Sequence, residues 1–161
     1  MPTSKSKLPN SIVMPYNWLV HRILHEAVSE AATKYAHGRL VDIGCGRKPW
    51  REVFAPHVDE YIGVDHANTQ HDIQFADVVA DAYDTTLPDG AADTVVSLAV
   101  LEHLEEPGAA IIEMARLLKP GGRLILTAPM FWHEHEAPRD FYRYTQYGLR
   151  HLIERAQLEV V

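Results

Sequence analysis

The sequence has a single cysteine, Cys45, and no long apolar run. One cysteine excludes an internal disulfide framework and a zinc site built on cysteines, and it fits a reducing compartment. No uninterrupted apolar stretch approaches the roughly 18 residues that a membrane-spanning helix needs. The first residues, MPTSKSKLPNS, lack the apolar core of a signal peptide. We therefore expect a soluble, cytoplasmic protein with no membrane partner.

Basic residues are scarce relative to acidic ones. The chain has 15 Lys and Arg against 22 Asp and Glu, which gives a formal net charge of −7. Nucleic acids and anionic membranes are bound through a basic footprint, so this balance argues against both partners. The remaining composition is ordinary: 161 residues with 47% hydrophobic and 23% charged residues predict one globular domain with its own core.

Short β-rich runs alternate with helical stretches through most of the chain. After a polar tail over residues 1–11, apolar residues at helical spacing predict a helix to about residue 36. Strands are expected at 39–43, 61–65, 77–81, 93–98, 123–128 and 158–161, with further helices at 49–54, 107–118 and 145–156. This alternation predicts a Rossmann-like α/β fold, a doubly wound and mainly parallel sheet with helices on both faces. We divide the chain into an N-terminal tail and helix (1–37) and a ligand-binding domain (38–161).

The turn after the first expected strand carries the strongest motif. Sheets of this kind bind ligands beyond the carboxyl ends of their strands, and Gly44 and Gly46 would let a ligand approach the backbone closely there. Pro49 stands where the third glycine of a dinucleotide fingerprint would fall. The carboxylate of Asp42 is unfavourable beside a pyrophosphate but favourable beside a cationic ligand. A glycine turn without any ligand is the alternative for this motif alone.

Acidic residues also end the next two strands. Asp65 lies where an acidic residue usually accepts hydrogen bonds from ribose hydroxyls, and Asp81, with the backbone of Ala82, is placed to meet an adenine edge. Each acid alone is more often a solvated strand end. Three of them after successive strands indicate a nucleoside ligand with positive charge. S-adenosylmethionine, which carries an ammonium and a sulfonium but no phosphate, fits this pattern.

Five segments appear in an order typical of one family: LVDIGCG, YIGVDH, ADAYD, DTVVSLAVLEHLEEP and RLLKPGGRLILTAP. In them, over about residues 38–161, the chain resembles the class I S-adenosylmethionine-dependent methyltransferases of small-molecule type, including the ubiquinone-pathway enzymes. The resemblance implies a set of cofactor contacts: Asp42, Gly44, Cys45 and Gly46 at the methionine moiety, Asp65 and His66 at the ribose, Asp81 and Ala82 at the adenine, and Leu98 near the methyl group.

The chain departs from the family pattern in two places. The family's glycine loop often continues with a further glycine, where this chain has Arg47, Lys48 and Pro49, which bears on how the cofactor carboxylate is held. The family sheet normally ends with a sixth strand and an antiparallel seventh, whereas this chain stops at Val161, inside the expected sixth. We therefore expect an incomplete C-terminal strand hairpin. A homodimer or a missing C-terminal segment would cover the apolar fifth strand.

Histidines supply the candidate catalytic groups. His103 follows Glu102 just after the fourth strand, where ubiquinone-pathway enzymes carry a Glu-x-x-Glu-His pattern that binds a divalent metal. The first acid of that pattern is replaced by Ala99 here, so we assign no metal site. His103 is a candidate general base, because histidine titrates near neutral pH, although a side chain that only shapes the pocket is an equal alternative.

The segment over residues 130–144 is rich in aromatic, histidine and arginine side chains. We expect it to be a mobile lid that contacts the acceptor, since lids are drawn from segments of low stability. His133 and His135 alternate, so an extended backbone would place both on one face, as bases or as metal ligands. Arg139 or Arg143 would meet an anionic group of the acceptor.

Methyl transfer is an in-line displacement that needs alignment and a dry pocket more than a strong base. We therefore predict a methyltransferase that uses S-adenosyl-L-methionine and acts on a small-molecule acceptor. Oxygen is the expected acceptor atom, because His103, His133 and His135 offer candidate bases. Two alternatives stay open. One is a catalytically silent domain that binds cofactor or a protein partner, and the other is a nicotinamide-dependent oxidoreductase, which Asp42 and Pro49 disfavour.

Overall fold

The computed structural model describes residues 17–69 and 72–161, so the expected tail over residues 1–11 lies outside the described residues. The helices are α1 (Trp18–Tyr35), α2 (Arg51–Phe54), α3 (Pro107–Leu117) and α4 (Gln146–Arg155). The strands are β1 (Arg39–Ile43), β2 (Glu60–Asp65), β3 (Val78–Val79), β4 (Ala92–Leu98) and β5 (Leu118–Thr127). Short 3₁₀ turns η2 (Ala55–His57), η3 (Ile73–Phe75) and η4 (Leu101–His103) connect them.

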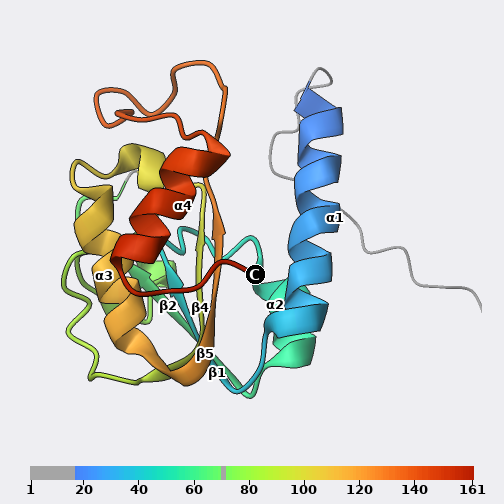
Figure 1. The fold of residues 1–161 in the computed structure, drawn as a ribbon, viewed down its shortest axis with the longest axis vertical. Helices are drawn as coiled ribbons and strands as arrows, with labels where there is room; N and C mark the ends of the chain where they lie inside the picture. The colour runs from blue at the N-terminus through green and yellow to red at the C-terminus, as the bar shows by residue number, and fades with distance from the viewer. Residues whose placement is uncertain (1–16, 70–71) are drawn as a thin grey trace, which may run out of the picture.

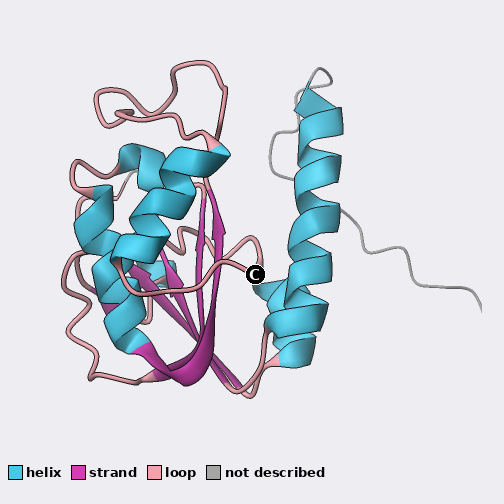
Figure 2. Ribbon diagram, in the orientation of Figure 1, coloured by secondary structure: helices cyan, strands magenta, loops and turns pink. Residues whose placement is uncertain are grey.

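The strands form one parallel sheet in the order β3-β2-β1-β4-β5. Helices α3 and α4 cover one face of this sheet, and α1 and α2 cover the other (Figures 1 and 2). Because β1 lies between β2 and β4, the chain winds outward from it in both directions. The Rossmann-like, doubly wound parallel sheet predicted from the sequence is therefore confirmed.

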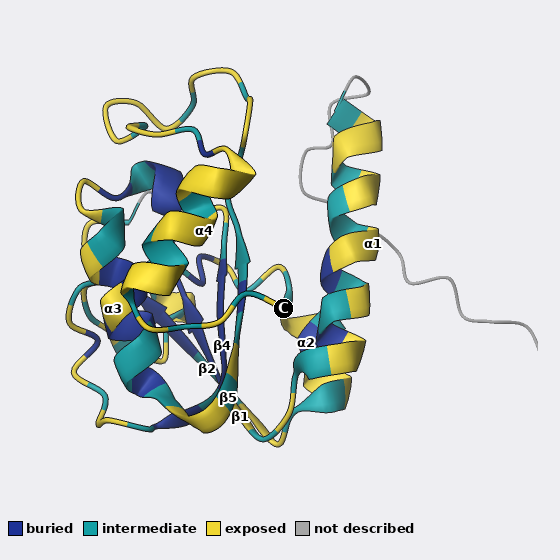
Figure 3. Cartoon of the chain, in the orientation of Figure 1, coloured by how far each residue is buried: buried dark blue, intermediate teal, exposed yellow. Residues whose placement is uncertain are grey.

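Alternation of side chains along the strands builds a core on each face. In β1, Leu40 packs with α1 and α2, while Val41 and Ile43 pack on the face of α3. In β4, Val95 and Val96 divide in the same way. The buried side chains therefore form two layers with the sheet between them (Figure 3). A rigid sheet covered on both faces holds the loops at its carboxyl end in fixed positions.

Two strands differ from the expected length by more than one residue. The third was expected over 77–81 and covers only Val78–Val79, because Asp81 instead forms an isolated bridge with Asp84 in a tight turn. The fifth was expected at 123–128 and begins at Leu118, where it pairs with Ala92 before an irregularity in the register. Both changes lie at the ends of the strands and leave their central residues in place.

The expected sixth strand at residues 158–161 is wrong. Gln157 adopts a left-handed φ of 61°, and the N–H of Leu158 donates to the carbonyl of Ile153, so the chain turns back at the end of α4. The last four residues then pair with no strand in the described part of the chain, and β5 is the last strand on its side of the sheet. Across residues 17–69 and 72–161, no helix combines the length and the hydropathy that crossing a membrane requires.

Candidate active site

An open cavity lies at the carboxyl end of the sheet. Its floor comes from the ends of β1, β2 and β3, and its opposite wall comes from the residues after β4 and from the loop between β5 and α4. The lining includes the predicted Gly44, Asp65, His66, Asp81, Ala82 and His103. It also includes Arg139, which we expected to meet an anionic group of the acceptor, and residues that we did not predict to line it: Asn68, Thr69, Ala99, Val100, Leu104 and Glu136. Ala99 and Val100 follow the end of β4 directly, which is the signal that could have identified them.

Asp65 is the most firmly held acid of this floor. It is 7% exposed, and its two carboxylate oxygens accept the backbone N–H of Gly46 and of His66, each at 2.8 Å. The contact with Gly46 ties the end of β2 to the glycine turn after β1. A carboxylate oxygen can accept more than one hydrogen bond, so Asp65 keeps acceptor capacity toward the cavity that it lines.

Asp42 lies beneath the glycine turn and is absent from the lining of the cavity. Burial raises the pKa of its carboxyl to about 7, although a hydrogen bond from the Tyr61 hydroxyl opposes this. The same environment raises the pKa of Tyr61. The predicted role of Asp42 at the methionine moiety stays a prediction, and its observed contact is with β2 across the register of the sheet.

The glycine turn leaves no space for larger residues. Gly44 has a φ of +74°, and a Cβ atom there would lie 2.5 Å from a methyl carbon of Val100. Cys45 is buried, and burial raises the pKa of its thiol to about 12, so the thiol is neutral. Lys48 has a left-handed φ of 55°, which glycine adopts more easily, and its ammonium contacts Asp77 at 2.5 Å. This charge is thus paired beside β2 and β3.

Leu98 does not line the cavity near which we expected it. Leu98 packs on the face of α1 and α2, as Val96 does two residues earlier, and it does not line the cavity. The side chains of Ala99 and Val100 line it instead. Ala99 has a φ of 58°, and its N–H donates to Thr127 at the end of β5. This left-handed residue turns the chain across the cavity after β4.

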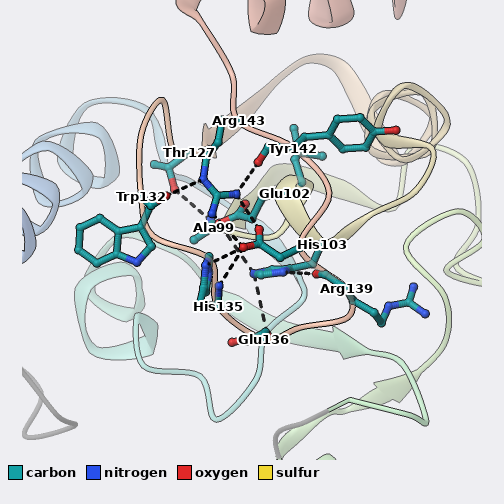
Figure 4. A network of polar contacts seen from close by, with 12 residues as sticks. Ala99, Glu102, His103, Thr127, Trp132, His135, Glu136, Arg139, Tyr142 and Arg143 are labelled. Atoms are coloured by element: carbon teal, nitrogen blue, oxygen red, sulfur yellow. Dashed lines mark hydrogen bonds and ion pairs between the residues drawn. The ribbon is translucent and has the colours of Figure 1, made fainter.

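His103 and His135 lie together beside Glu102 (Figure 4). The ring centres of the two histidines are 4.7 Å apart in an edge-to-face arrangement. Nδ1 of His103 is 2.6 Å from the carbonyl oxygen of Arg139. A carbonyl can only accept, so in the neutral ring Nδ1 carries the proton and Nε2 carries the lone pair. Nε2 lies 3.9 Å from a carboxylate oxygen of Glu102 and 3.8 Å from one of Glu136. His133 is exposed, stacks on Trp132 and does not line the cavity.

The loop between β5 and α4 is fastened to η4 by hydrogen bonds. The N–H groups of Phe141 and Tyr142 donate to the carbonyl of Glu102, and the Tyr144 hydroxyl donates to the carbonyl of Leu101 at 2.9 Å. Arg143 forms a two-pronged ion pair with Asp140, which holds the pKa of that carboxyl well below its usual range. Such dense contacts argue against the mobile lid that we expected and favour a fixed wall.

Comparisons with known proteins find methyltransferases. Residues 16–161 match the family model described as a methyltransferase domain. The chain belongs to this methyltransferase family. Its match begins at residue 16 and so includes α1. Other relatives are named as S-adenosylmethionine-dependent methyltransferases, and S-adenosyl-L-methionine is the cofactor of the family. The class I resemblance seen in the sequence is therefore confirmed.

Two relatives are named as methyltransferases that act on oxygen. The chain is 32% identical over 111 residues to mouse tRNA (carboxymethyluridine(34)-5-O)-methyltransferase ALKBH8, covering 64% of this chain and 16% of that protein. It is 29% identical over 101 residues to ubiquinone biosynthesis O-methyltransferase of Aeromonas salmonicida, covering 55% and 42%. The chain thus spans less than half of the length of these curated relatives.

The solved structure of YcgJ from Bacillus subtilis has the same fold. It superimposes with a TM-score of 0.71 at 22% identity, over 86% of this chain and 69% of that one. This likeness extends the agreement from motifs to the arrangement of strands and helices. The methyltransferase domain described here therefore has the architecture of its family, with its cavity at the carboxyl ends of the strands.

Proposed function

We propose that this domain binds S-adenosyl-L-methionine in the cavity and transfers its methyl group to oxygen of a small-molecule acceptor. One observation carries the proposal. The ends of β1, β2 and β3 bring Gly44, Asp65 and Asp81 to one cavity, and His103 lies on its opposite wall. A floor suited to a nucleoside and a candidate base would thus share one concave site. The family membership supplies the reaction type.

The residues of the floor fit this cofactor chemically. Asp65 and His66 are proposed to hold the ribose, Asp81 and Ala82 the adenine, and the backbone of Gly44, Cys45 and Gly46 the methionine moiety. The strand ends contribute the carboxylates of Asp65 and Asp81 and no Lys or Arg to the floor, which suits a cationic ligand better than a pyrophosphate. The oxidoreductase alternative, which Asp42 and Pro49 disfavour in the sequence, is disfavoured here by the carboxylates of Asp65 and Asp81.

Alignment and proton removal are the tasks left to the chain. The bound cofactor supplies an electrophilic methyl group on its sulfonium. Ala99 and Val100 form an apolar wall that limits water near the acceptor, which favours displacement in a dry pocket. Nε2 of His103 accepts the proton of the acceptor hydroxyl, while the carbonyl of Arg139 keeps the ring oriented through Nδ1. His135 supports His103 by edge-to-face contact, and His133, on the outer side, is the weakest of the three candidates.

The acceptor is proposed on charge and geometry. Two relatives methylate oxygen according to their names, one on a tRNA base and one in ubiquinone biosynthesis. With a net charge of −7, the chain does not have the excess of basic residues that tRNA binding needs. We therefore favour a small molecule as the acceptor. A cytoplasmic location and the homodimer or C-terminal segment that would cover β5 stay predictions.

A methyl-transfer assay with labelled S-adenosyl-L-methionine tests this proposal. We expect label in small hydroxyl compounds and none in bulk tRNA. His103→Gln should lower kcat at least tenfold with little change in cofactor affinity, since general bases typically contribute about 10²–10⁴-fold. His151→Gln, on the exposed side of α4, is the matched control. Label in tRNA alone would replace the small-molecule acceptor, and cofactor binding with no transfer to any acceptor would favour the silent domain.

A further inference from the structure

A carboxylate and two imidazoles converge beside the wall of the cavity. Glu102 and His103 lie in η4, whereas His135 comes from the loop after β5 (Figure 4). One ligand atom from each lies within 4.8 Å of the other two. Oxygen and imidazole nitrogen atoms are the ligands that divalent transition metals take in proteins. Because His135 lies far from the other two residues in the sequence, no local motif indicates this cluster.

The two histidines are oriented as metal ligands usually are. Nδ1 of His103 donates to the carbonyl of Arg139, and Nδ1 of His135 lies 3.3 Å from the carbonyl of His133 and 3.4 Å from a carboxylate oxygen of Asp140. Oxygen acceptors hold the proton on Nδ1 of both rings and leave Nε2 free to coordinate. Metal-binding histidines almost always donate their second nitrogen to such a group.

Glu102 provides an independent observation that points to a cation. Its side chain is only 1% exposed, and its Oε2 atom has no hydrogen-bond partner within the described residues. Burial raises the pKa of this carboxyl. The guanidinium of Arg143 could have served as a partner, but it bonds Asp140 and the backbone carbonyls of residues 132, 133 and 142. A buried oxygen without a partner is costly and rare in native proteins, so it calls for an explanation.

We propose that Glu102, His103 and His135 bind one divalent metal ion of the zinc class. Two nitrogens and one carboxylate oxygen with an open position are the ligand set of catalytic zinc sites. In a tetrahedral site with metal–ligand bonds of about 2.0–2.1 Å, the ligand atoms lie about 3.4 Å apart. The three side chains would therefore have to move their ligand atoms together by about 1 Å. Ala99 leaves no acid one turn earlier, and His135 provides the third ligand instead.

Because His103 lines the cavity, the open coordination position of the ion would be accessible from the cavity. If the proposed function holds, the ion binds the acceptor oxygen there. In the metal-free chain Nε2 of His103 is the candidate base. With the ion bound Nε2 is a ligand, and the ion would take over the activation of the acceptor hydroxyl. Metal binding itself does not depend on the proposed function, because it needs only the three side chains.

Titration of the metal-free chain with Co²⁺ and then Zn²⁺ tests the site. We expect one ion per chain, a visible Co²⁺ absorption typical of four or five ligands, and its loss when Zn²⁺ displaces Co²⁺. His135→Gln and Glu102→Gln should each weaken Zn²⁺ at least tenfold. His133→Gln is the matched control, because it removes an exposed imidazole two residues away and keeps the backbone carbonyl. Thermal unfolding checks that each variant folds. If Glu102→Gln does not fold, the Zn²⁺ affinity of His135→Gln decides whether the site exists.

Absence of stoichiometric binding would overturn the site, and so would equal weakening by His133→Gln or no weakening by His135→Gln. S-adenosylhomocysteine binding is measured calorimetrically on the same metal-free and Zn²⁺-loaded samples. Zn²⁺ binding without any S-adenosylhomocysteine binding would support the metal site and contradict the proposed function. S-adenosylhomocysteine binding without Zn²⁺ binding would do the reverse.

Discussion

Asparagine at position 65 tests the link between the glycine turn and the ligand. The carboxylate of Asp65 accepts the N–H of Gly46 and the N–H of His66 at 2.8 Å each, in a buried position. Asp65→Asn keeps the shape but replaces one oxygen by an NH₂ group, so one backbone N–H loses its acceptor. A buried donor without a partner costs about 1–3 kcal/mol. We expect the free energy of unfolding, measured by chemical denaturation, to fall by that amount.

The same substitution should also weaken the binding of S-adenosylhomocysteine, the product that the cofactor becomes after methyl transfer. Because Asp65 is proposed to accept the ribose hydroxyls, losing one oxygen should raise the Kd of S-adenosylhomocysteine by about 5- to 150-fold, which corresponds to about 1–3 kcal/mol. Asp81→Asn is the control for stability. Asp81 is exposed and accepts a single N–H, from Tyr83 at 3.1 Å, so its loss should cost no more than about 0.5 kcal/mol. An unchanged Kd in Asp65→Asn would show that the ribose does not lie at Asp65.

Three further substitutions test parts of the fold around the site. Burial alone would raise the pKa of Glu113, but hydrogen bonds from Arg116 and neighbouring groups lower it to about 2. Its carboxylate thus stabilises the fold above an unfolded pKa of 4.5, and this contribution disappears as the pH falls toward 2. Glu113→Gln should remove about 3 kcal/mol at pH 7 and flatten the acid limb of the stability curve, whereas an unchanged limb would place the acid sensitivity elsewhere. Arg143→Lys cannot form the two-pronged pair, so hydrogen exchange should accelerate over residues 130–144 and stay slow in the strands; equal rates in parent and variant would restore the idea of a mobile lid. Gly44→Ala forces a Cβ at 2.5 Å from the valine after β4 and should cost about 1–3 kcal/mol in thermal unfolding, and a variant as stable as the parent would contradict the tight packing described here.

Local pattern predicted the centre of the sheet well. The run over 39–43 matches β1 residue for residue, because alternation within a covered strand is a property of the local sequence. Residues 158–161 have the same β-rich composition but pair with no strand among the described residues, and they remain irregular. Strand formation there depends on a neighbour that local composition does not describe. The short β3 also depends on tertiary context, since a turn competes for Asp81.

The floor of the site followed from strand ends, whereas its opposite wall did not. Asp65 and Asp81 line the cavity as expected because the ends of parallel strands meet at one edge. Leu98 packs on the face of α1 and α2 rather than in the lining, because the direction of its side chain depends on which face of β4 it occupies. The meeting of His103 with His135 depends on the path of a whole loop across η4. No spacing rule within the sequence could have predicted that contact.

Calorimetric titration of the chain with S-adenosylhomocysteine and, separately, with NADH tests the central claim most directly. The acids at the strand ends and the family membership predict one site per chain with micromolar affinity for S-adenosylhomocysteine, and no heat of binding for NADH. Binding of NADH without any response to S-adenosylhomocysteine would contradict the assignment of this cavity to S-adenosyl-L-methionine.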